Sequence, residues 1–300
     1  MHTQHALRTS AFKQVDVFTA NPMFGNALAV VFDSDGLTTE DMQRIAAWTN
    51  LSETTFVLPP TQAGADYRVR IFTPCSELPF AGHPSVGTAH ALIESERIAV
   101  KPNLMQECAA GLLPVEVIGE GIDQRIFVRA PRATLRGLAS DAVARLSGAL
   151  GTSVAETSAP SIVNVGPDWL ICDLAVEATV RSLKPDMTEI GKLCTDLNLV
   201  GIAVFGRAHG SNYALAVRAF CPAHGIPEDP VTGSANAAIG AFLHARGGLD
   251  AIGAQYRASQ GREVGRDGFV DVRVNCDTGD VDIGGQTVTC IDGVLALPHK

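Results

Sequence analysis

Short runs of β-branched or alternating apolar residues recur along most of the chain, and they predict a protein built mainly of β-strands. Turn-forming residues separate these runs, as in Asp277-Thr278-Gly279-Asp280 and Gly284-Gly285. The predicted strands are Gln14–Thr19, Ala27–Phe32, Thr54–Leu58, Tyr67–Phe72, Arg125–Arg129, Ile162–Val165, Trp169–Leu174, Ile202–Phe205, Tyr213–Phe220, Phe269–Val274 and Thr287–Ile291.

Helical patterns are fewer, and four segments carry them. Thr38 is a typical cap before an acidic first turn, and a second helix is predicted from Ser140 to Leu150. Two further helices begin near His83 and Ser234 and consist largely of small and apolar residues. No strand–helix alternation with a GxGxxG fingerprint is present, which argues against a dinucleotide-binding fold. The pattern instead favours mostly antiparallel strands with one long central helix in each half.

Two pairs of related segments indicate an internal duplication. Pro79–Gly87 and Pro230–Ala238 share a glycine followed by one short polar residue and a helical run. Asp41–Leu51 and Asp186–Leu199 also resemble each other, and both lead into an apolar strand. The two pairs occur in the same order at nearly the same offset, which predicts two similar halves.

A domain boundary near Ala130-Pro131-Arg132 fits both the composition and the repeat offset, and no low-complexity linker is present. We predict an N-terminal lobe over residues 1–130, a C-terminal lobe over 131–285, and a last strand over 286–300 that returns to the first lobe. Each glycine turn opens a helix, and a helix N-terminus offers unpaired N–H groups and partial positive charge. Gly82 and Gly233 are therefore expected to let backbone N–H groups approach one small anionic molecule in a cleft between the lobes.

Charge and length narrow the class of protein. The 300 residues are 46% hydrophobic and carry a net charge of −9, with no basic stripe that would suit nucleic acid. No apolar run is long enough to cross a bilayer, and Met1–Ser10 lacks the core of a signal peptide. We therefore expect a cytoplasmic protein that binds neither membranes nor nucleic acid.

Metal and disulfide chemistry find little support in the sequence. The seven cysteines are odd in number and include no CxxC pair, so buried or half-buried free thiols are expected. The eight histidines show no HxH or HxxxH spacing, and neither a GxSxG elbow nor a phosphate-binding loop is present. We expect no metal and no other cofactor.

Four side chains are candidates for chemistry, and each has an ordinary alternative. Glu53 lies between a predicted helix and the next strand. It is either a partly desolvated base or a solvated loop residue. His83 lies at the start of one helix, where it could donate to a substrate, shuttle a proton, or serve only as a capping or packing residue. Asp229 orients His83 or the substrate, or is an ordinary acidic residue in a loop. Ser234 caps the second helix, faces the substrate, or does both.

The longer motifs resemble one family. The chain is similar to the PhzF family of phenazine-biosynthesis isomerase-like proteins over most of its length. The residues that carry the resemblance are Asn50-Leu51-Ser52-Glu53-Thr54, Arg70–Pro74, Glu77–Pro84 and Arg218–Phe220 with Glu228–Ala235. Phe24-Gly25-Asn26, Gln260-Gly261 and Gly265-Arg266 also match. One departure is Ala27, where the family usually has proline.

The resemblance implies an α+β fold of the diaminopimelate epimerase type, with two pseudo-symmetric lobes, each a mostly antiparallel barrel-like sheet around a central helix. It places the catalytic roles on Glu53, His83, Asp229 and Ser234, with the glutamate moving the proton. It places substrate contacts on Ser52, Gly82, Gly233 and Ala235. A homodimer is implied by the resemblance alone.

Related racemases of this fold use two cysteines, one before each glycine. This chain has Ala81 and Thr232 there, and neither is an acid or base at neutral pH, so a two-thiol racemase is excluded. The expected function is a cofactor-independent isomerase that moves a proton on a small carboxylated substrate by glutamate acid–base catalysis. A small-anion binding protein without efficient turnover and a glutamate-dependent hydrolase or lyase stay open as alternatives.

Overall fold

The computed structural model describes residues 8–154, 158–209 and 212–297. Residues 1–7, which form most of the segment expected to lack a signal peptide, lie outside the described residues. Contacts divide the chain into two compact units. Unit 1 contains residues 1–23, 27–128 and 286–300, and unit 2 contains residues 24–26 and 129–285. Among the described residues, no helix is both long and apolar enough to cross a membrane.

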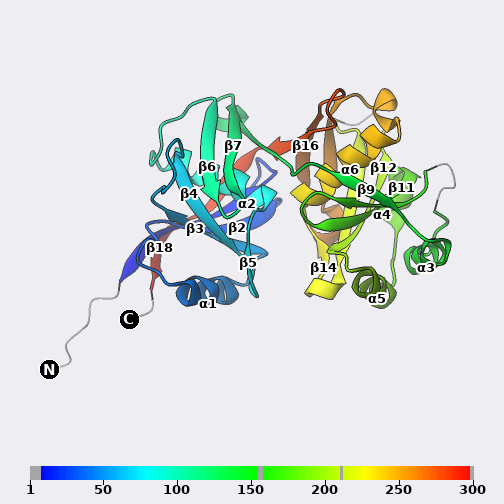
Figure 1. The fold of residues 1–300 in the computed structure, drawn as a ribbon, viewed down its shortest axis with the longest axis horizontal. Helices are drawn as coiled ribbons and strands as arrows, with labels where there is room; N and C mark the ends of the chain where they lie inside the picture. Colours follow the sequence, from blue (N-terminus) through cyan, green and yellow to red (C-terminus); the bar gives the residue numbers. More distant parts are fainter. Residues whose placement is uncertain (1–7, 155–157, 210–211, 298–300) are drawn as a thin grey trace. The chain divides into compact units, whose positions relative to one another are not determined.

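Unit 1 consists of strands that surround one helix, with a second helix outside them (Figure 1). Its elements are β1 (Thr9–Val17), β2 (Asn26–Val31), α1 (Thr39–Thr49), β3 (Glu53–Leu58), β4 (Tyr67–Phe72), β5 (Glu77–Leu78), α2 (Gly82–Glu94), β6 (Asn103–Cys108), β7 (Gly111–Ile118), β8 (Arg125–Arg129) and β18 (Thr287–Ala296). The pairs β2–β3 and β4–β6 are parallel, whereas β1–β18, β3–β4, β4–β5, β6–β7 and β7–β8 are antiparallel.

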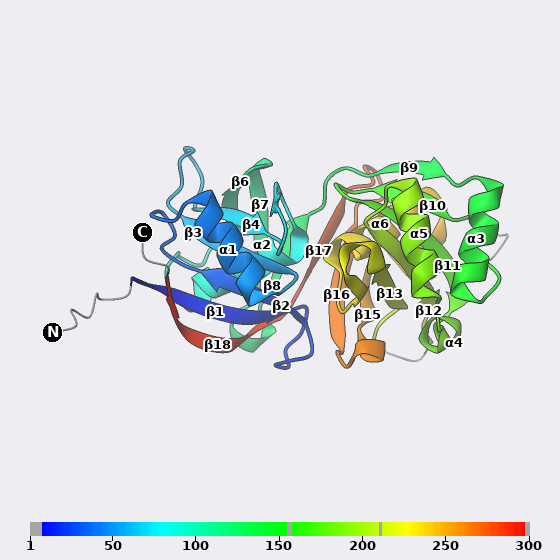
Figure 2. The same ribbon diagram turned by 90° about the horizontal axis from the view of Figure 1, so that it is seen from below.

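Unit 2 repeats this plan with extra helices (Figure 2). Its elements are β9 (Thr134–Gly137), α3 (Ser140–Leu150), β10 (Ser161–Asn164), β11 (Asp168–Val176), α4 (Glu177–Ser182), α5 (Met187–Leu197), β12 (Gly201–Arg207), β13 (Leu215–Cys221), β14 (Ile226–Asp229), α6 (Gly233–Ala245), β15 (Gln255–Gln260), β16 (Gly268–Val274) and β17 (Val281–Gly285). The pairs β11–β12 and β13–β15 are parallel, and β12–β13, β13–β14, β15–β16 and β16–β17 are antiparallel.

The central helices explain how each unit closes around its core. In α2 every residue from His83 to Ala89 is buried, and in α6 burial runs from Ala235 to Leu243. A helix that is buried on all sides needs strands all round it, and α2 touches β1, β3, β7 and β18. A Cβ on Gly87 would lie 2.6 Å from Leu28 Cδ2, so glycine is needed for α2 to approach β2 this closely.

The two units share an arginine–glutamate pair at matching positions, as the predicted duplication leads one to expect. Arg70 of β4 makes two hydrogen bonds to Glu77 of β5, each 2.7 Å long. Arg218 of β13 makes the same two bonds to Glu228 of β14, at 2.9 and 2.8 Å. The α+β class with two similar lobes, expected from the sequence, is therefore confirmed.

Local caps fix where the outer helices begin and end. Thr38 accepts a hydrogen bond from the Asp41 N–H while the Asp41 carboxylate accepts one from the Thr38 N–H, which completes a capping box. Asp186 caps α5 by accepting from the N–H groups of Thr188 and Glu189. Both helices end on an asparagine in the left-handed region, Asn50 and Asn198. The paired segments noted in the sequence are thus the same helix in each unit.

Two sequence expectations need correction here. The cysteines were expected to be buried or half-buried, but Cys75 and Cys276 are exposed. Their neighbours Thr73 and Asn275 hold tight turns at the surface, which leaves each thiol facing water. The strand predicted from Tyr213 begins instead at Leu215, after residues 210–211, which are not described.

Candidate active site

Glu53 stands at the first position of β3, directly after the turn that ends α1. Asn50 closes the helix with φ 52° and donates its N–H to the Ala46 carbonyl at 3.2 Å. Glu53 then pairs in parallel register with Leu28 of β2. Its side chain is only 16% exposed, so the solvated-loop interpretation of this glutamate is wrong.

His83 is the second residue of α2, and its imidazole faces Glu53. Nε2 of His83 lies 3.1 Å from Oε2 of Glu53, and the histidine side chain is 9% exposed. The residue before the helix, Ala81, is extended, and no side chain caps this end, so His83 is not a capping residue. The structure therefore brings together the two candidate residues of unit 1.

Burial sets the protonation state of this pair. Removal of the ring from water lowers the pKa of His83 from 6.5 to about 3, so the imidazole is neutral near pH 7. A carboxyl oxygen and a ring nitrogen 3.1 Å apart repel each other unless one of them carries a proton. A proton on Nε2 or on the Glu53 carboxyl removes this repulsion, and the two atoms do not make a hydrogen bond with each other in the structure. This arrangement suits proton transfer.

We expect the pKa of His83 to be visible in the stability of the protein. The unfolded imidazole takes up a proton as pH falls through 6.5, whereas the folded one resists until about pH 3. Its contribution is therefore complete above pH 6.5 and is lost as pH falls toward 3. Between pH 7 and pH 5 the loss is about 2 kcal/mol of unfolding free energy.

Urea unfolding of the native protein and of His83→Gln at several pH values measures this contribution as a difference. The native protein should lose about 2 kcal/mol more than the variant between pH 7 and pH 5. Parallel curves for the two proteins would show that the histidine is not held neutral by burial.

A buried polar chain supports the first turn of α2. Ser85 donates its hydroxyl to the Ala81 carbonyl at 2.9 Å and accepts from the Gln106 side chain at 2.9 Å. Gln106 in turn accepts from the Tyr67 hydroxyl at 3.1 Å. These groups are shielded from water, so their bonds hold the start of the helix rigidly. Sequence reasoning missed them; a glutamine and a serine within apolar segments were the available signal.

Asp229 ends β14 in unit 2, and two side chains hold its carboxylate. Thr232 donates its hydroxyl to Oδ2 at 2.5 Å, and Asn26 donates its amide to Oδ1 at 3.2 Å. Burial raises the pKa of Asp229, while these two hydrogen bonds act in the opposite direction. The alternative of a plain loop acid is therefore wrong.

Gln260 locks the turn between Asp229 and α6. Its amide donates to the Asp229 carbonyl and to the Thr232 hydroxyl, both at 2.9 Å, and its oxygen accepts from the Thr232 N–H at 3.1 Å. The Asn236 amide adds a bond to the same oxygen at 3.0 Å. Gln260 and Asn236 are fully buried, so this network leaves the Asp229 backbone little freedom.

Ser234, the second residue of α6, accepts a hydrogen bond from the indole N–H of Trp169 at 3.1 Å. It does not cap the helix, because the N-cap residue is Thr232 and no side chain makes a capping bond there. Glu53 and His83 belong to unit 1, and Asp229 and Ser234 belong to unit 2. The structure thus shows two half-sites, each described within its own unit.

The residues expected to contact substrate lie beside these side chains. Ser52 immediately precedes Glu53 and is half-buried, and Gly82 and Gly233 are the first residues of α2 and α6. Ala235 is fully buried. Among the described residues, no group of three metal-binding side chains lies close enough to hold an ion.

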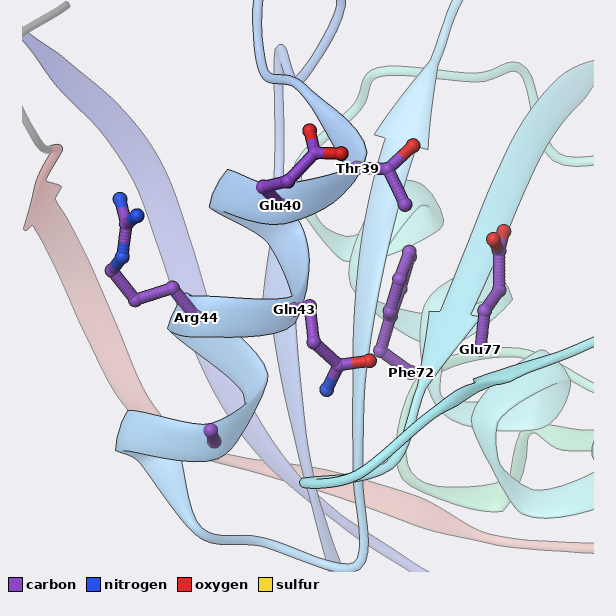
Figure 3. A pocket seen from close by; sticks show the side chains of 7 residues that line it. Thr39, Glu40, Gln43, Arg44, Phe72 and Glu77 are labelled. Atoms are coloured by element: carbon purple, nitrogen blue, oxygen red, sulfur yellow. The ribbon is translucent and has the colours of Figure 1, made fainter.

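A shallow hollow of about 500 Å³ in unit 1 lies apart from these residues (Figure 3). It is lined by α1 and by the edge of β4 and β5, with Gln43 and Phe72 facing it. Of its two acidic residues, Glu40 and Glu77, the second accepts hydrogen bonds from Arg70, and Gln43 donates to the Thr73 carbonyl. These groups are engaged in structural bonds, so we assign no chemistry to this hollow.

Comparison with known proteins identifies the class. The chain is 36% identical over 291 residues to "Antisense-enhancing sequence 1" of Schizosaccharomyces pombe, covering 94% of this chain and 97% of the other. It is 35% identical over 297 residues to the trans-2,3-dihydro-3-hydroxyanthranilate isomerase of Pseudomonas chlororaphis, covering 94% and 98%. Several relatives that match nearly the whole chain are named isomerases, which places the protein among the isomerases.

Solved structures agree with the sequence comparison. A PhzF-family protein of Bacillus anthracis superposes with a TM-score of 0.83 at 27% identity, covering 96% of this chain and 99% of the other. A hydroxyproline epimerase of Agrobacterium vitis, at 16% identity and a TM-score of 0.63 over 97% and 93% of the chains, shares the fold. Residues 15–293 match the family described as phenazine biosynthesis-like protein, PhzC-PhzF, and the chain belongs to that family.

Proposed function

We propose that the protein is a cofactor-independent isomerase that moves a proton on a small carboxylated substrate, with Glu53 as the general acid and base. The single observation that carries this proposal is the buried contact of 3.1 Å between Glu53 Oε2 and His83 Nε2 at the start of α2. A binding protein needs no proton-carrying pair there. A hydrolase would need room for an activated water between the pair and its substrate.

The proposed reaction begins with the carboxylate form of Glu53. Glu53 removes a proton from a carbon next to an unsaturated group, and the electron pair moves into that system. The resulting carboxylic acid then returns the same proton to another carbon on the same face. No atom or electron is gained or lost overall, so the reaction requires no redox group. General acid–base catalysis of this kind contributes about 10²–10⁴-fold.

The other groups act on charge and orientation. In this proposal His83 stays neutral: it either donates a hydrogen bond from Nε2–H to the Glu53 carboxylate or, in its other tautomer, accepts one from protonated Glu53. The N–H groups at the start of α2 stabilise negative charge that develops on the substrate. We propose that Asp229 and Ser234 bind polar groups of the same substrate, together with Ser52 and the backbone of Gly82, Gly233 and Ala235.

The first compound to assay is trans-2,3-dihydro-3-hydroxyanthranilate, for which several relatives are named. Purified protein stripped with a chelator, and checked by elemental analysis and absorption spectroscopy, should turn over at the same rate as untreated protein. A rate that depends on a bound metal or chromophore would refute the cofactor-independent proposal.

The homodimer expected from the family stays a prediction, which light scattering of the purified protein can check.

Proton transfer should be partly internal, because the Glu53 carboxyl is shielded from water. In heavy water the product should therefore carry less than one deuterium at the new C–H position. Mass spectrometry of the product at low conversion measures this fraction. Full deuterium incorporation in the first turnovers would show that the proton exchanges with solvent before it returns.

A further inference from the structure

The helices α2 and α6 each carry a polar residue at their second position, but those residues meet different partners. His83 faces the Glu53 carboxyl in unit 1, and Ser234 faces the Trp169 indole in unit 2, each at 3.1 Å. Glu53 comes from the strand after α1, whereas Trp169 comes from β11, the strand before α5. The second unit has therefore placed a hydrogen-bond donor where the first has a proton acceptor.

The strand register explains why unit 2 has an indole where unit 1 has a carboxyl group. Glu53 pairs with Leu28 in unit 1, and Gly201 pairs with Trp169 at the matching position of unit 2. A Cβ on Gly201 would lie 2.6 Å from Trp169 Cζ3 and 2.5 Å from the Phe220 carbonyl oxygen. No side chain fits at position 201, and the indole occupies that space. Unit 2 consequently has no counterpart of the Glu53 side chain.

Hydrogen-bonding rules then fix the state of the Ser234 hydroxyl. An indole N–H can only donate, so Ser234 Oγ must accept from Trp169. Among the described residues, no acceptor lies in hydrogen-bonding geometry with the Ser234 hydroxyl hydrogen. By contrast, the Ser85 hydroxyl in α2 donates to the carbonyl of Ala81. The Ser234 hydrogen therefore stays available for a ligand.

We propose that Trp169 is a positioning residue that holds Ser234 as a hydrogen-bond donor to an acceptor atom of the substrate, such as a carboxylate or carbonyl oxygen. This rests on the proposed function, in which Ser234 touches the substrate. Without the indole N–H, the hydroxyl loses its fixed partner and can rotate its hydrogen away from the substrate. Substrate would then have to reorient the hydroxyl before binding.

A kinetic double-mutant cycle on Trp169→Phe and Ser234→Ala tests the role. A neutral hydrogen bond of this kind corresponds to a loss of roughly 3- to 10-fold in kcat/KM for Trp169→Phe alone, mainly through a higher KM. Once Ser234 is alanine, Trp169→Phe should lower kcat/KM by less than about 2-fold more, because the group it positions is gone. Equal losses in both backgrounds would assign Trp169 to packing alone and overturn the proposal.

Replacement of Trp169 by β-(3-benzothienyl)alanine separates the N–H from the ring. This analogue keeps the bicyclic shape and puts sulfur in place of the N–H, so it should fold if Trp169→Phe does not. It is expected to show the loss of kcat/KM predicted for Trp169→Phe at an unchanged melting temperature. Native kcat/KM for the analogue would overturn the proposal.

Fluorescence reports the same bond without turnover. The chain has two tryptophans, and Trp48 is 75% exposed whereas Trp169 is 1% exposed, so Trp48→Phe leaves Trp169 as the single emitter. In that background Ser234→Ala should shift Trp169 emission to shorter wavelength, because the indole N–H loses its acceptor. Ser182→Ala, elsewhere in unit 2, is the matched control and should leave emission unchanged. An unshifted spectrum for Ser234→Ala would contradict the bond.

These outcomes are separable from failure of the proposed function. If Glu53→Gln keeps full turnover, the assignment of the base fails, but the coupling of Trp169 and Ser234 is still measured in the same kinetic cycle. If Glu53→Gln is inactive and the cycle is additive, only the role of Trp169 fails.

Discussion

Glu53→Gln is expected to fold as the native protein does and to lose at least about 10²-fold in kcat. Glutamine keeps the shape of the side chain and can still contact His83 Nε2, so the packing at the start of β3 is retained. It cannot take up a proton from carbon, because an amide is not a base near neutral pH. The unfolding free energy should therefore stay within about 1 kcal/mol of the native value.

The matched control is Glu40→Gln, which removes the same charge from the exposed first turn of α1. It should leave kcat and KM unchanged. Steady-state kinetics give kcat and KM, and urea unfolding gives the unfolding free energy, for the native protein and both variants. Native kcat in a stably folded Glu53→Gln variant would show that Glu53 is not the base. It would favour Asp229 instead, because burial raises the pKa of that carboxyl group.

Local sequence signals predicted the elements that are fixed by local chemistry. The helix predicted from Ser140 to Leu150 has those bounds, and Thr38 caps α1 as expected. Every predicted strand overlaps a strand of the structure. The repeat also identified the segment at Asp186 as the partner of α1, although its helix α5 was not predicted as such. Caps and apolar periodicity act within a few residues, which is why they can be read from one sequence.

Two of the missed strands, β6 and β15, have buried polar residues, which the apolar pattern cannot reveal. The strand β7 was also missed, because Pro114 lies inside its apolar run and proline disfavours a strand. The strand β6 contains Gln106 and Glu107, which bond Ser85 and the turn at Thr61, and both are almost fully buried. The strand β15 ends on Ser259 and Gln260, which are fully buried and bonded within unit 2. These residues look like surface positions until their distant partners are known. The short elements β5, β9, β14, β17 and α4 offer too few residues for any periodic signal.

In the candidate site too, the sequence identified individual residues but not the contacts between distant ones. The glycine turns and the family resemblance named Glu53, His83, Asp229 and Ser234 from the sequence. The contact of Glu53 with His83 joins residues 30 positions apart, and that of Trp169 with Ser234 joins residues 65 positions apart. Such contacts depend on strand register and helix placement, so neither the neutral state of His83 nor the role of Trp169 could be derived from spacing.

The largest effect on stability is expected at the ion pair next to Asp229. Arg218 and Glu228 are each only 6% exposed, and Arg218 also donates to the carbonyls of Val180 and Leu183. Glu228→Gln leaves the guanidinium buried without an opposite charge, which costs about 3–5 kcal/mol of unfolding free energy. Because Glu228 immediately precedes Asp229 on β14, the variant should also lose turnover at temperatures where the rest of unit 2 stays folded.

The chain supplies its own control for this prediction. Arg70 and Glu77 make the same paired hydrogen bonds in unit 1, but their side chains are 24% and 33% exposed. Water can solvate either partner there, so Glu77→Gln should cost no more than about 1 kcal/mol. Urea unfolding followed by circular dichroism compares the two variants, and Trp169 emission in the Trp48→Phe background reports unit 2 alone. Equal losses for Glu228→Gln and Glu77→Gln would show that geometry, and not burial, determines the strength of these ion pairs.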